Sequence, residues 1–81
     1  MKYNIEIRPR AMKDLRRIGG DNAVRILKGI RAMEDDLAGD VKRLTKFEIG
    51  YRLRVGEYRV LFDIEKSNAI IRRIKHRREA Y

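Results

Sequence analysis

The sequence contains no cysteine and a single histidine, His76. The absence of cysteine excludes disulfides and thiolate metal sites, and one histidine argues against a histidine-rich metal site. No apolar run approaches the roughly 18 residues of a membrane span, and the first residues lack the apolar core of a signal peptide. We therefore expect a cytoplasmic protein with no membrane partner and no metal or other cofactor.

Several kinds of catalytic motif are missing as well. The chain has no glycine-rich phosphate loop, no cluster of metal ligands and no Ser/His/Asp order that would suggest a catalytic triad. It also has no pair of carboxylates on the face expected to carry the arginines of residues 50–63. These absences argue against P-loop enzymes, metalloenzymes and triad hydrolases.

The length of 81 residues allows one domain, residues 1–81, with one modest core. Its hydrophobic content of 43% is enough for a packed globule, so the charged fraction of 41% does not indicate disorder. The net charge of +9 is uneven, with a surplus of two over residues 1–40 and of seven over residues 41–81. Such a field suits a nucleic-acid or acidic protein partner, although charge that serves only solubility is the simpler alternative.

The central stretch, residues 50–63, predicts a β-hairpin. Apolar and basic residues alternate on both sides of Gly56-Glu57, which is the mark of half-buried strands. A glycine in the first turn position suits a two-residue turn that needs positive φ. This turn pairs Val55 with Tyr58 and thereby sets the register of the whole hairpin.

In this register Arg54 faces Arg59, and Arg52 lies beside them on the same side. Like charges that oppose each other across a hairpin are unfavourable, so this convergence needs a reason. An anionic ligand is the simplest one, and a solvated face on a very basic protein is the alternative.

The preceding chain predicts one strand and two helices. Residues 3–7 alternate as a short strand, Pro9 suits the first turn of a helix, and Gly19-Gly20 ends that helix. A second helix with apolar residues at helical spacing follows and ends near Gly39. Gly29 within it costs about 1 kcal/mol against alanine unless another element crosses closely there.

After an irregular connection over residues 40–49 and the hairpin, residues 69–74 predict a last strand followed by a basic tail. The order β-α-α-β-β-β predicts an α+β domain. In it a small antiparallel sheet carries an α-hairpin on one face and leaves the arginine face open. Leu44 and Phe47 of the connection are expected to plug the edge of the core rather than to contact RNA.

The groups left for chemistry are the arginines, His76 and Tyr81. Fixed cationic donors suit reactions at phosphate, because they stabilise the charge that grows on the non-bridging oxygens without a metal. RNA supplies its own nucleophile, the 2′-OH. Composition alone does not separate cleavage from simple binding.

Residues 51–62 of the hairpin and residues 73–81 of the C-terminal segment resemble the RelE branch of the RelE/ParE toxin superfamily, and the similarity extends over essentially the whole chain. The resemblance implies the toxin of a type II toxin–antitoxin pair, an endoribonuclease that enters the ribosomal A site and cuts mRNA by 2′-OH attack. It also implies a RelB-like antitoxin as partner, and operator DNA bound only through the antitoxin complex.

The resemblance also implies roles for individual residues. Arg59 would bind the phosphate and stabilise the transition state, and the region of Arg77 would orient the RNA and assist the leaving group. Tyr81 would stack on a base or orient the 2′-OH. Well-known RelE proteins have lysines where this chain has Arg52 and Arg54, and an arginine is a poor general base.

We therefore expect these two arginines to act electrostatically and His76 to contribute to proton transfer. His76 as a polar residue at a strand end is the alternative. Contacts to RNA or the ribosome are expected from seven further basic side chains of the second half: Lys42, Arg43, Lys46, Arg72, Arg73, Lys75 and Arg78.

Two other functions fit the same residues. A ParE-like toxin would inhibit DNA gyrase by binding it, without chemistry of its own. A non-enzymatic basic module would only bind nucleic acid or ribosomes. The three arginines and the terminal tyrosine favour the nuclease, because a protein-binding toxin has no need to converge charge on a phosphate.

Overall fold

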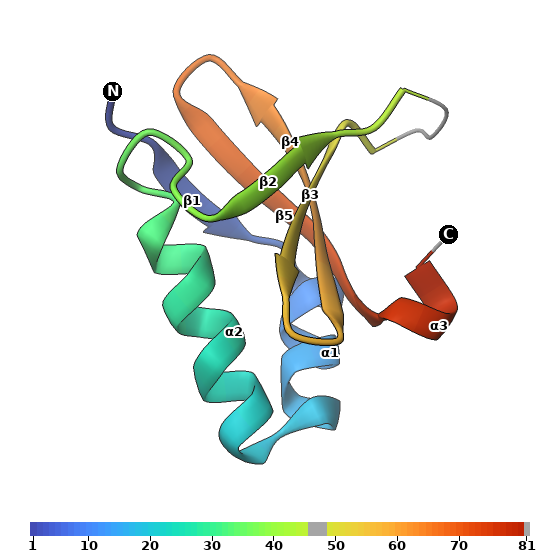
Figure 1. Cartoon of the computed structure of the whole chain (residues 1–81). Helices are drawn as coiled ribbons and strands as arrows, with labels where there is room; N and C mark the ends of the chain where they lie inside the picture. The colour runs from blue at the N-terminus through green and yellow to red at the C-terminus, as the bar shows by residue number, and fades with distance from the viewer. Residues whose placement is uncertain (46–48, 81) are drawn as a thin grey trace.

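The computed structural model describes residues 1–45 and 49–80 (Figure 1). Its elements are β1 (Asn4–Ile7), α1 (Pro9–Ile18), α2 (Gly20–Ala32), β2 (Asp40–Arg43), β3 (Tyr51–Val55), β4 (Tyr58–Glu65), β5 (Asn68–His76) and α3 (Arg77–Ala80). The two long helices lie on one side of the sheet, and the short α3 follows the end of β5. In the described part of the chain, no helix is long and apolar enough to cross a membrane.

The sheet has five strands in the order β1-β5-β4-β3-β2. Neighbouring strands are antiparallel except β1, which runs parallel to β5 with Ile7 opposite Ile71. The α+β class and the layer of two long helices are as predicted, but the second helix ends at Ala32 rather than near Gly39. The expected antiparallel sheet is a mixed one. The reason is that the first strand enters beside the last strand, and sequence order does not reveal such a neighbour.

Residues 40–43 form the edge strand β2, so the prediction of an irregular connection there was wrong. Val41 lies opposite Leu53 and is half-buried, while Asp40 and Lys42 are exposed. One apolar residue in a four-residue strand gives too little alternation to recognise, and pairing with β3 is what makes this segment a strand. Phe47 lies outside the described residues.

The C-terminal segment is also more regular than predicted. The last strand extends from Asn68 to His76, and α3 replaces the expected tail. The backbone N–H of Arg77 donates to the carbonyl of Glu57 at 2.7 Å, which places the start of α3 against the β3–β4 turn. This contact holds the end of β5 beside the hairpin.

The β3–β4 hairpin has the predicted register. Val55 pairs with Tyr58, Arg54 with Arg59, and Gly56 of the turn has a φ of +58°. Positive φ is the conformation for which glycine was expected there. The alternating residues of the two strands therefore point to the predicted faces.

The core lies between the helices and the sheet. It consists of buried side chains from both layers: Ala11, Leu15, Ile26, Ile30, Met33, Leu53, Val60, Phe62, Ala69, Ile71 and Ile74. Gly29 marks the point where α2 crosses β3, because a Cβ atom there would lie 2.9 Å from Cγ2 of Val55. The close crossing that would justify a glycine in this helix is confirmed.

Candidate nucleic-acid interface

The face of the sheet opposite the helices carries two rows of cross-strand neighbours. One row contains Asp40, Arg54, Arg59 and Lys75, and the other contains Lys42, Arg52, Leu61 and Arg73. Paired residues of adjacent strands share a face, so these side chains form one surface. We call the five residues Lys42, Arg52, Arg54, Arg59 and Lys75 the basic face.

Arg59 is held by the backbone of its own hairpin. Its Nη1 donates to the carbonyl of Gly56 at 3.3 Å and to that of Tyr58 at 3.2 Å. Within the described residues, neither Arg54 nor Arg59 forms an ion pair with an acidic side chain. Two guanidiniums thus oppose each other without an ion pair to a described acidic residue, although Asp40 lies opposite Arg54 at the end of the row.

Arg52 is tied more closely to the protein. Its side chain is 14% exposed, and its Nη1 donates to the carbonyl of Asp40 at 2.8 Å and to Oδ1 of the same residue at 3.3 Å. Because this aspartate neutralises part of the charge, Arg52 contributes less to the field than the other two arginines of the hairpin. The three predicted arginines share a face, but they are not equivalent.

Two of the arginines predicted to bind RNA are engaged in internal ion pairs. Arg72 donates from Nε to Oδ2 of Asp63 at 3.0 Å, and Arg73 donates from Nε to Oδ2 of Asp14 at 2.9 Å. The Arg73 side chain is only 23% exposed. Its first role is to join β5 to α1, which is a correction to the expectation of a free RNA contact.

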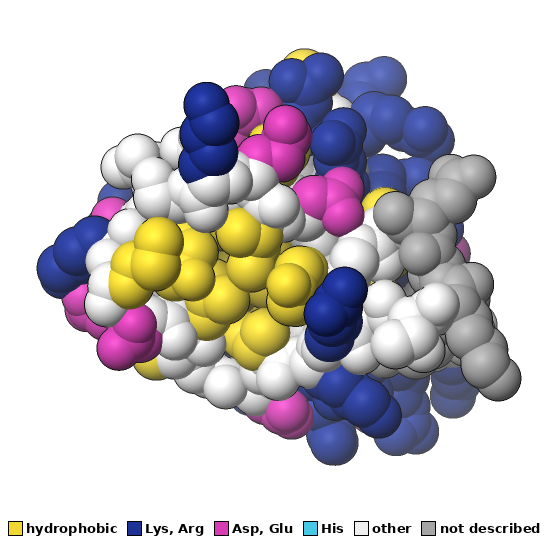
Figure 2. Space-filling view, turned by 90° about the horizontal axis from the view of Figure 1, so that it is seen from above, with side chains coloured by type: hydrophobic (Ala, Val, Ile, Leu, Met, Phe, Trp, Pro, Cys, Tyr) yellow, Lys and Arg dark blue, Asp and Glu magenta, His cyan; other side chains and the backbone are white. Residues whose placement is uncertain are grey.

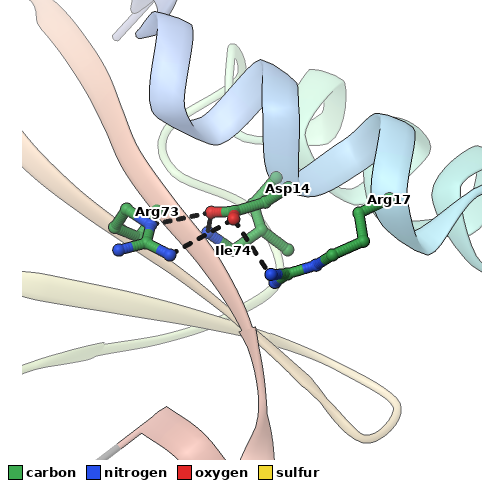
Figure 3. Close-up of polar contacts among 4 residues, drawn as sticks. All are labelled: Asp14, Arg17, Arg73 and Ile74. Atoms are coloured by element: carbon green, nitrogen blue, oxygen red, sulfur yellow. Dashed lines mark hydrogen bonds and ion pairs between the residues drawn. The ribbon is translucent and has the colours of Figure 1, made fainter.

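Asp14 is the polar residue that sequence reasoning missed (Figure 3). It is 4% exposed and accepts hydrogen bonds from the Arg73 guanidinium and from the backbone N–H of Ile74, the latter at 2.9 Å. Arg17 approaches its Oδ1 at 3.5 Å. Strand β1 ends opposite Ile71, so the carboxylate occupies the edge of β5 that β1 leaves unpaired.

The environment of Asp14 keeps the carboxylate charged. Burial by itself raises the pKa of Asp14, but the hydrogen bonds from Arg73 and from the Ile74 N–H lower it, as do the charges of Arg73 and Arg17. The net result is a pKa below the usual value for aspartate. The charge pattern of α1 could have revealed this residue, because Asp14 is the one acidic residue in a helix rich in basic residues.

His76 is not beside the arginines. It pairs with Tyr58, whose side chain packs toward the core, so it lies on the helix side of the sheet. The two rings meet edge to face with centroids 5.4 Å apart, and Nε2 lies 3.3 Å from a carboxylate oxygen of Glu57. Its Nδ1 accepts the backbone N–H of Arg78 at 3.2 Å. The structure does not bring His76 to the basic face.

The remaining predicted residues are scattered. Arg77 and Arg78 are exposed on α3, and Arg43 pairs with Tyr51 on the helix side of the sheet. Lys75, in contrast, lies directly opposite Arg59 on the basic face. Lys46 and Tyr81 are outside the described residues. Among the residues that the structure describes, no group of three acidic or histidine side chains could hold a metal ion.

A second surface is apolar. At the end of the sheet away from the β3–β4 turn, Ile5, Tyr51 and Ile64 pack against the core and are only half-buried. Figure 2 looks down on the molecule from above the view of Figure 1 and shows apolar side chains gathered into one area bordered by charged ones. We call Ile5, Tyr51 and Ile64 the apolar end of the sheet.

Comparison with known proteins identifies the family. The family model described as "ParE toxin of type II toxin-antitoxin system, parDE" matches residues 5–81. Two curated relatives from Methanocaldococcus jannaschii, RelE1 and the toxin RelE3, are each 32% identical, over 100% and 86% of this chain and 97% and 85% of their own lengths. The chain belongs to the RelE/ParE superfamily of type II toxins.

Solved structures share the fold of this toxin. The RelB–RelE antitoxin–toxin complex from Methanococcus jannaschii contains a chain that is 28% identical, with a TM-score of 0.74 and coverage of 90% of this toxin and 91% of that chain. A chain of the toxin–antitoxin complex RelBE2 from Mycobacterium tuberculosis reaches a TM-score of 0.81 at 20% identity, covering 94% of this toxin and 99% of that chain. The latter likeness establishes the fold alone.

Proposed function

We propose that this toxin is an endoribonuclease that cuts mRNA in the A site of the ribosome, without a metal, by 2′-OH attack. The observation that carries the proposal is the row in which Arg54, Arg59 and Lys75 lie on consecutive strands of one open face. Neighbouring strands are about 4.8 Å apart, so the three cations can surround one phosphodiester group. Relatives named RelE support the nuclease branch.

The paired arginines would bind the phosphate and stabilise the transition state. The 2′-oxygen forms a bond to phosphorus while the bond to the 5′-oxygen of the next nucleotide breaks, which leaves a 2′,3′-cyclic phosphate and a 5′-hydroxyl group. Negative charge grows on the non-bridging oxygens during this step. Guanidiniums that are already held by the hairpin, as Arg59 is by two carbonyls, stabilise that charge with little reorganisation.

Two protons must move in the same step, one from the 2′-OH and one to the 5′-oxygen. Arginine holds its proton too tightly to take part, whereas a lysine ammonium can donate one. We assign the donation to the 5′-oxygen to Lys75, because it lies opposite Arg59 and His76 lies on the other face. The 2′-OH proton would pass to water or to a ribosomal group, since the ribosome completes the site.

The experiment is primer extension on mRNA from translating ribosomes with the purified toxin added. We expect stops within A-site codons, and we expect them to disappear in the double variant Arg54→Gln/Arg59→Gln. The matched control is Arg16→Gln/Arg31→Gln, which removes the same charge from exposed helix positions. Absence of mRNA cuts with the wild-type toxin would refute the proposal.

The proposed partner is a RelB-like antitoxin. Related chains occur in complexes with such proteins, and this toxin offers two surfaces for one. An amphipathic antitoxin segment would place its apolar side on the apolar end of the sheet, and acidic residues would reach the basic face. Binding at both surfaces would block RNA from the arginines.

Inhibition of DNA gyrase is the second candidate function, because the matching family model is that of ParE toxins. A gyrase inhibitor would block supercoiling of plasmid DNA by purified gyrase and would leave mRNA intact. Arg54→Gln/Arg59→Gln and its control Arg16→Gln/Arg31→Gln separate the two candidate functions. Loss of the two arginines of the basic face abolishes RNA cleavage by a nuclease but need not affect gyrase inhibition by a protein-binding toxin.

A further inference from the structure

A groove at the start of α1 is not part of the basic face and has a composition of its own. It has a volume of about 590 Å³. Its lining contains four arginines, one aspartate and two apolar residues: Arg8, Arg10, Arg72, Arg73, Asp63, Pro9 and Ile49. Four guanidiniums that line one groove repel one another, so their convergence requires an explanation.

Two irregularities of the backbone bring these arginines together. The pairing of β4 with β5 shifts at Leu61/Phe62, which leaves Arg72 without a partner residue in β4 and places it next to Arg73. Their side chains reach different acids, Asp63 and Asp14. β1 ends at Ile7, and the turn into α1 delivers Arg8 and Arg10 to the same place.

The acids nearby do not balance these charges. Arg72 pairs with Asp63 and Arg73 with Asp14, while Arg8 meets Glu6 at 3.2 Å in an exposed ion pair. The four arginines of the groove carry one charge more than these three acids, so a net charge of +1 remains. The exposed pair contributes little to stability, because solvent screens it. Arg8 and Arg10 are exposed and can turn toward a ligand.

We propose that this groove binds a phosphate of the same single-stranded RNA whose scissile phosphate lies on the basic face. This inference rests on the proposed nuclease function for the identity of the strand. Arg73 belongs both to the groove and to the row that contains Arg52, so the two surfaces are continuous. The rows are two residues apart along the strands, which is about 7 Å.

The groove also suits the rest of a nucleotide. Pro9 and Ile49 supply apolar parts of the lining, against which a sugar or a base can pack. Guanidiniums bind phosphate through two parallel N–H groups and stack on base planes. A protein side chain with one carboxylate would satisfy fewer of these donors than a nucleotide does.

The test compares how tightly the wild-type toxin and a variant bind one RNA oligonucleotide. The oligonucleotide carries a 2′-deoxy nucleotide at the cut position and therefore stays intact. Affinities are measured over a range of salt concentrations for the wild-type toxin and for Arg8→Gln/Arg10→Gln. Each phosphate contact on a single strand contributes about 0.7 to the slope of log K against log salt. We expect the double variant to lose about 0.7 from the magnitude of this slope.

Two controls separate a specific contact from a general loss of charge. Arg16→Gln/Arg31→Gln removes the same charge elsewhere and should keep the wild-type slope. Arg8→Lys/Arg10→Lys keeps the charge and should restore most of the slope. Equal slopes for the wild-type toxin and for Arg8→Gln/Arg10→Gln would overturn the inference.

Shortening the oligonucleotide identifies the source of the phosphate. Removal of nucleotides from one end should weaken binding to the wild-type toxin and leave binding to Arg8→Gln/Arg10→Gln unchanged. If the variant instead loses binding of inorganic phosphate but not of the oligonucleotide, the groove holds a free anion and the inference is wrong.

These measurements need no cleavage, so they are independent of the nuclease assay. A toxin that leaves mRNA intact yet shows the change in salt slope would refute the nuclease proposal and keep the groove. A toxin that cuts mRNA and shows no change in slope would refute the groove alone.

Discussion

Asp14 and Arg73 are 59 positions apart in the sequence, and two hydrogen bonds join their side chains at 2.9 and 3.3 Å. This ion pair connects the buried side of α1 with the strand that carries Lys75. The Ile74 N–H donates to the same carboxylate, so one side chain replaces a strand at the edge of β5. The contact therefore fixes α1 against β5, the strand that contributes Lys75 to the basic face.

Replacement of Asp14 by asparagine should destabilise the toxin by about 3 kcal/mol, because it leaves Arg73 partly buried without its counter-charge. Urea unfolding followed by circular dichroism measures the loss. Glu65→Gln, which removes an exposed charge, is the matched control and should change stability by less than about 0.5 kcal/mol. A small effect at Asp14 would show that water satisfies the guanidinium instead.

The same pair predicts how stability depends on pH. The folded pKa of Asp14 lies below its unfolded value of about 4, so its contribution to stability is complete above about pH 5 and is lost as the pH falls through the folded pKa. The difference in unfolding free energy between the wild-type toxin and Asp14→Asn should therefore shrink between about pH 5 and pH 2. A difference that stays constant over this range would contradict the assignment.

Alanine at Gly29 should destabilise the toxin although alanine is the better helix former. The added Cβ atom would lie 2.9 Å from Val55, whose β-branched side chain cannot turn away easily. We expect a loss of about 1–3 kcal/mol, despite a gain of about 1 kcal/mol in helix propensity. Val55→Ala in the same chain should relieve the contact. The double variant should therefore lose less stability than the two single variants lose together.

Replacement of His76 by glutamine should leave the rate of ribosome-dependent cleavage unchanged. The imidazole lies on the helix side of the sheet, against Tyr58 and away from the paired arginines. Arg59→Gln, measured in the same assay, should lower the rate by about 10²–10³, the loss seen when an oxyanion-hole donor is removed from other enzymes. A comparable loss in the histidine variant would return His76 to the mechanism.

Lys75 should be needed for more than its charge. Lys75→Gln removes both the charge and the proton, and we expect a rate loss of about 10²–10⁴ for the missing proton donor. Lys75→Arg restores the charge alone. RNA affinity should therefore recover in the arginine variant while the cleavage rate stays low, and recovery of both would show that Lys75 acts only electrostatically.

Several features could be predicted because consecutive residues encode them. The alternation around Gly56 predicted the hairpin and the opposition of Arg54 and Arg59, and helical spacing with Gly19-Gly20 predicted the two helices. The resemblance to the RelE/ParE superfamily was correct, and the family model matches residues 5–81. The hairpin and the helices rest on a period of two or 3.6 residues, or on one turn, and neither requires knowledge of distant contacts.

The remaining features depend on how segments far apart in the sequence meet. The sequence by itself determined the amphipathic elements and the arginine face of the hairpin. Only the tertiary structure decided that β1 lies beside β5, that Asp14 withdraws Arg73 from solvent and that β5 continues to His76. That continuation is what puts Lys75 on the basic face and His76 on the opposite one. The physical reason is that a one-residue shift in register or a different helix crossing exchanges the partners of every side chain, while the local pattern stays the same.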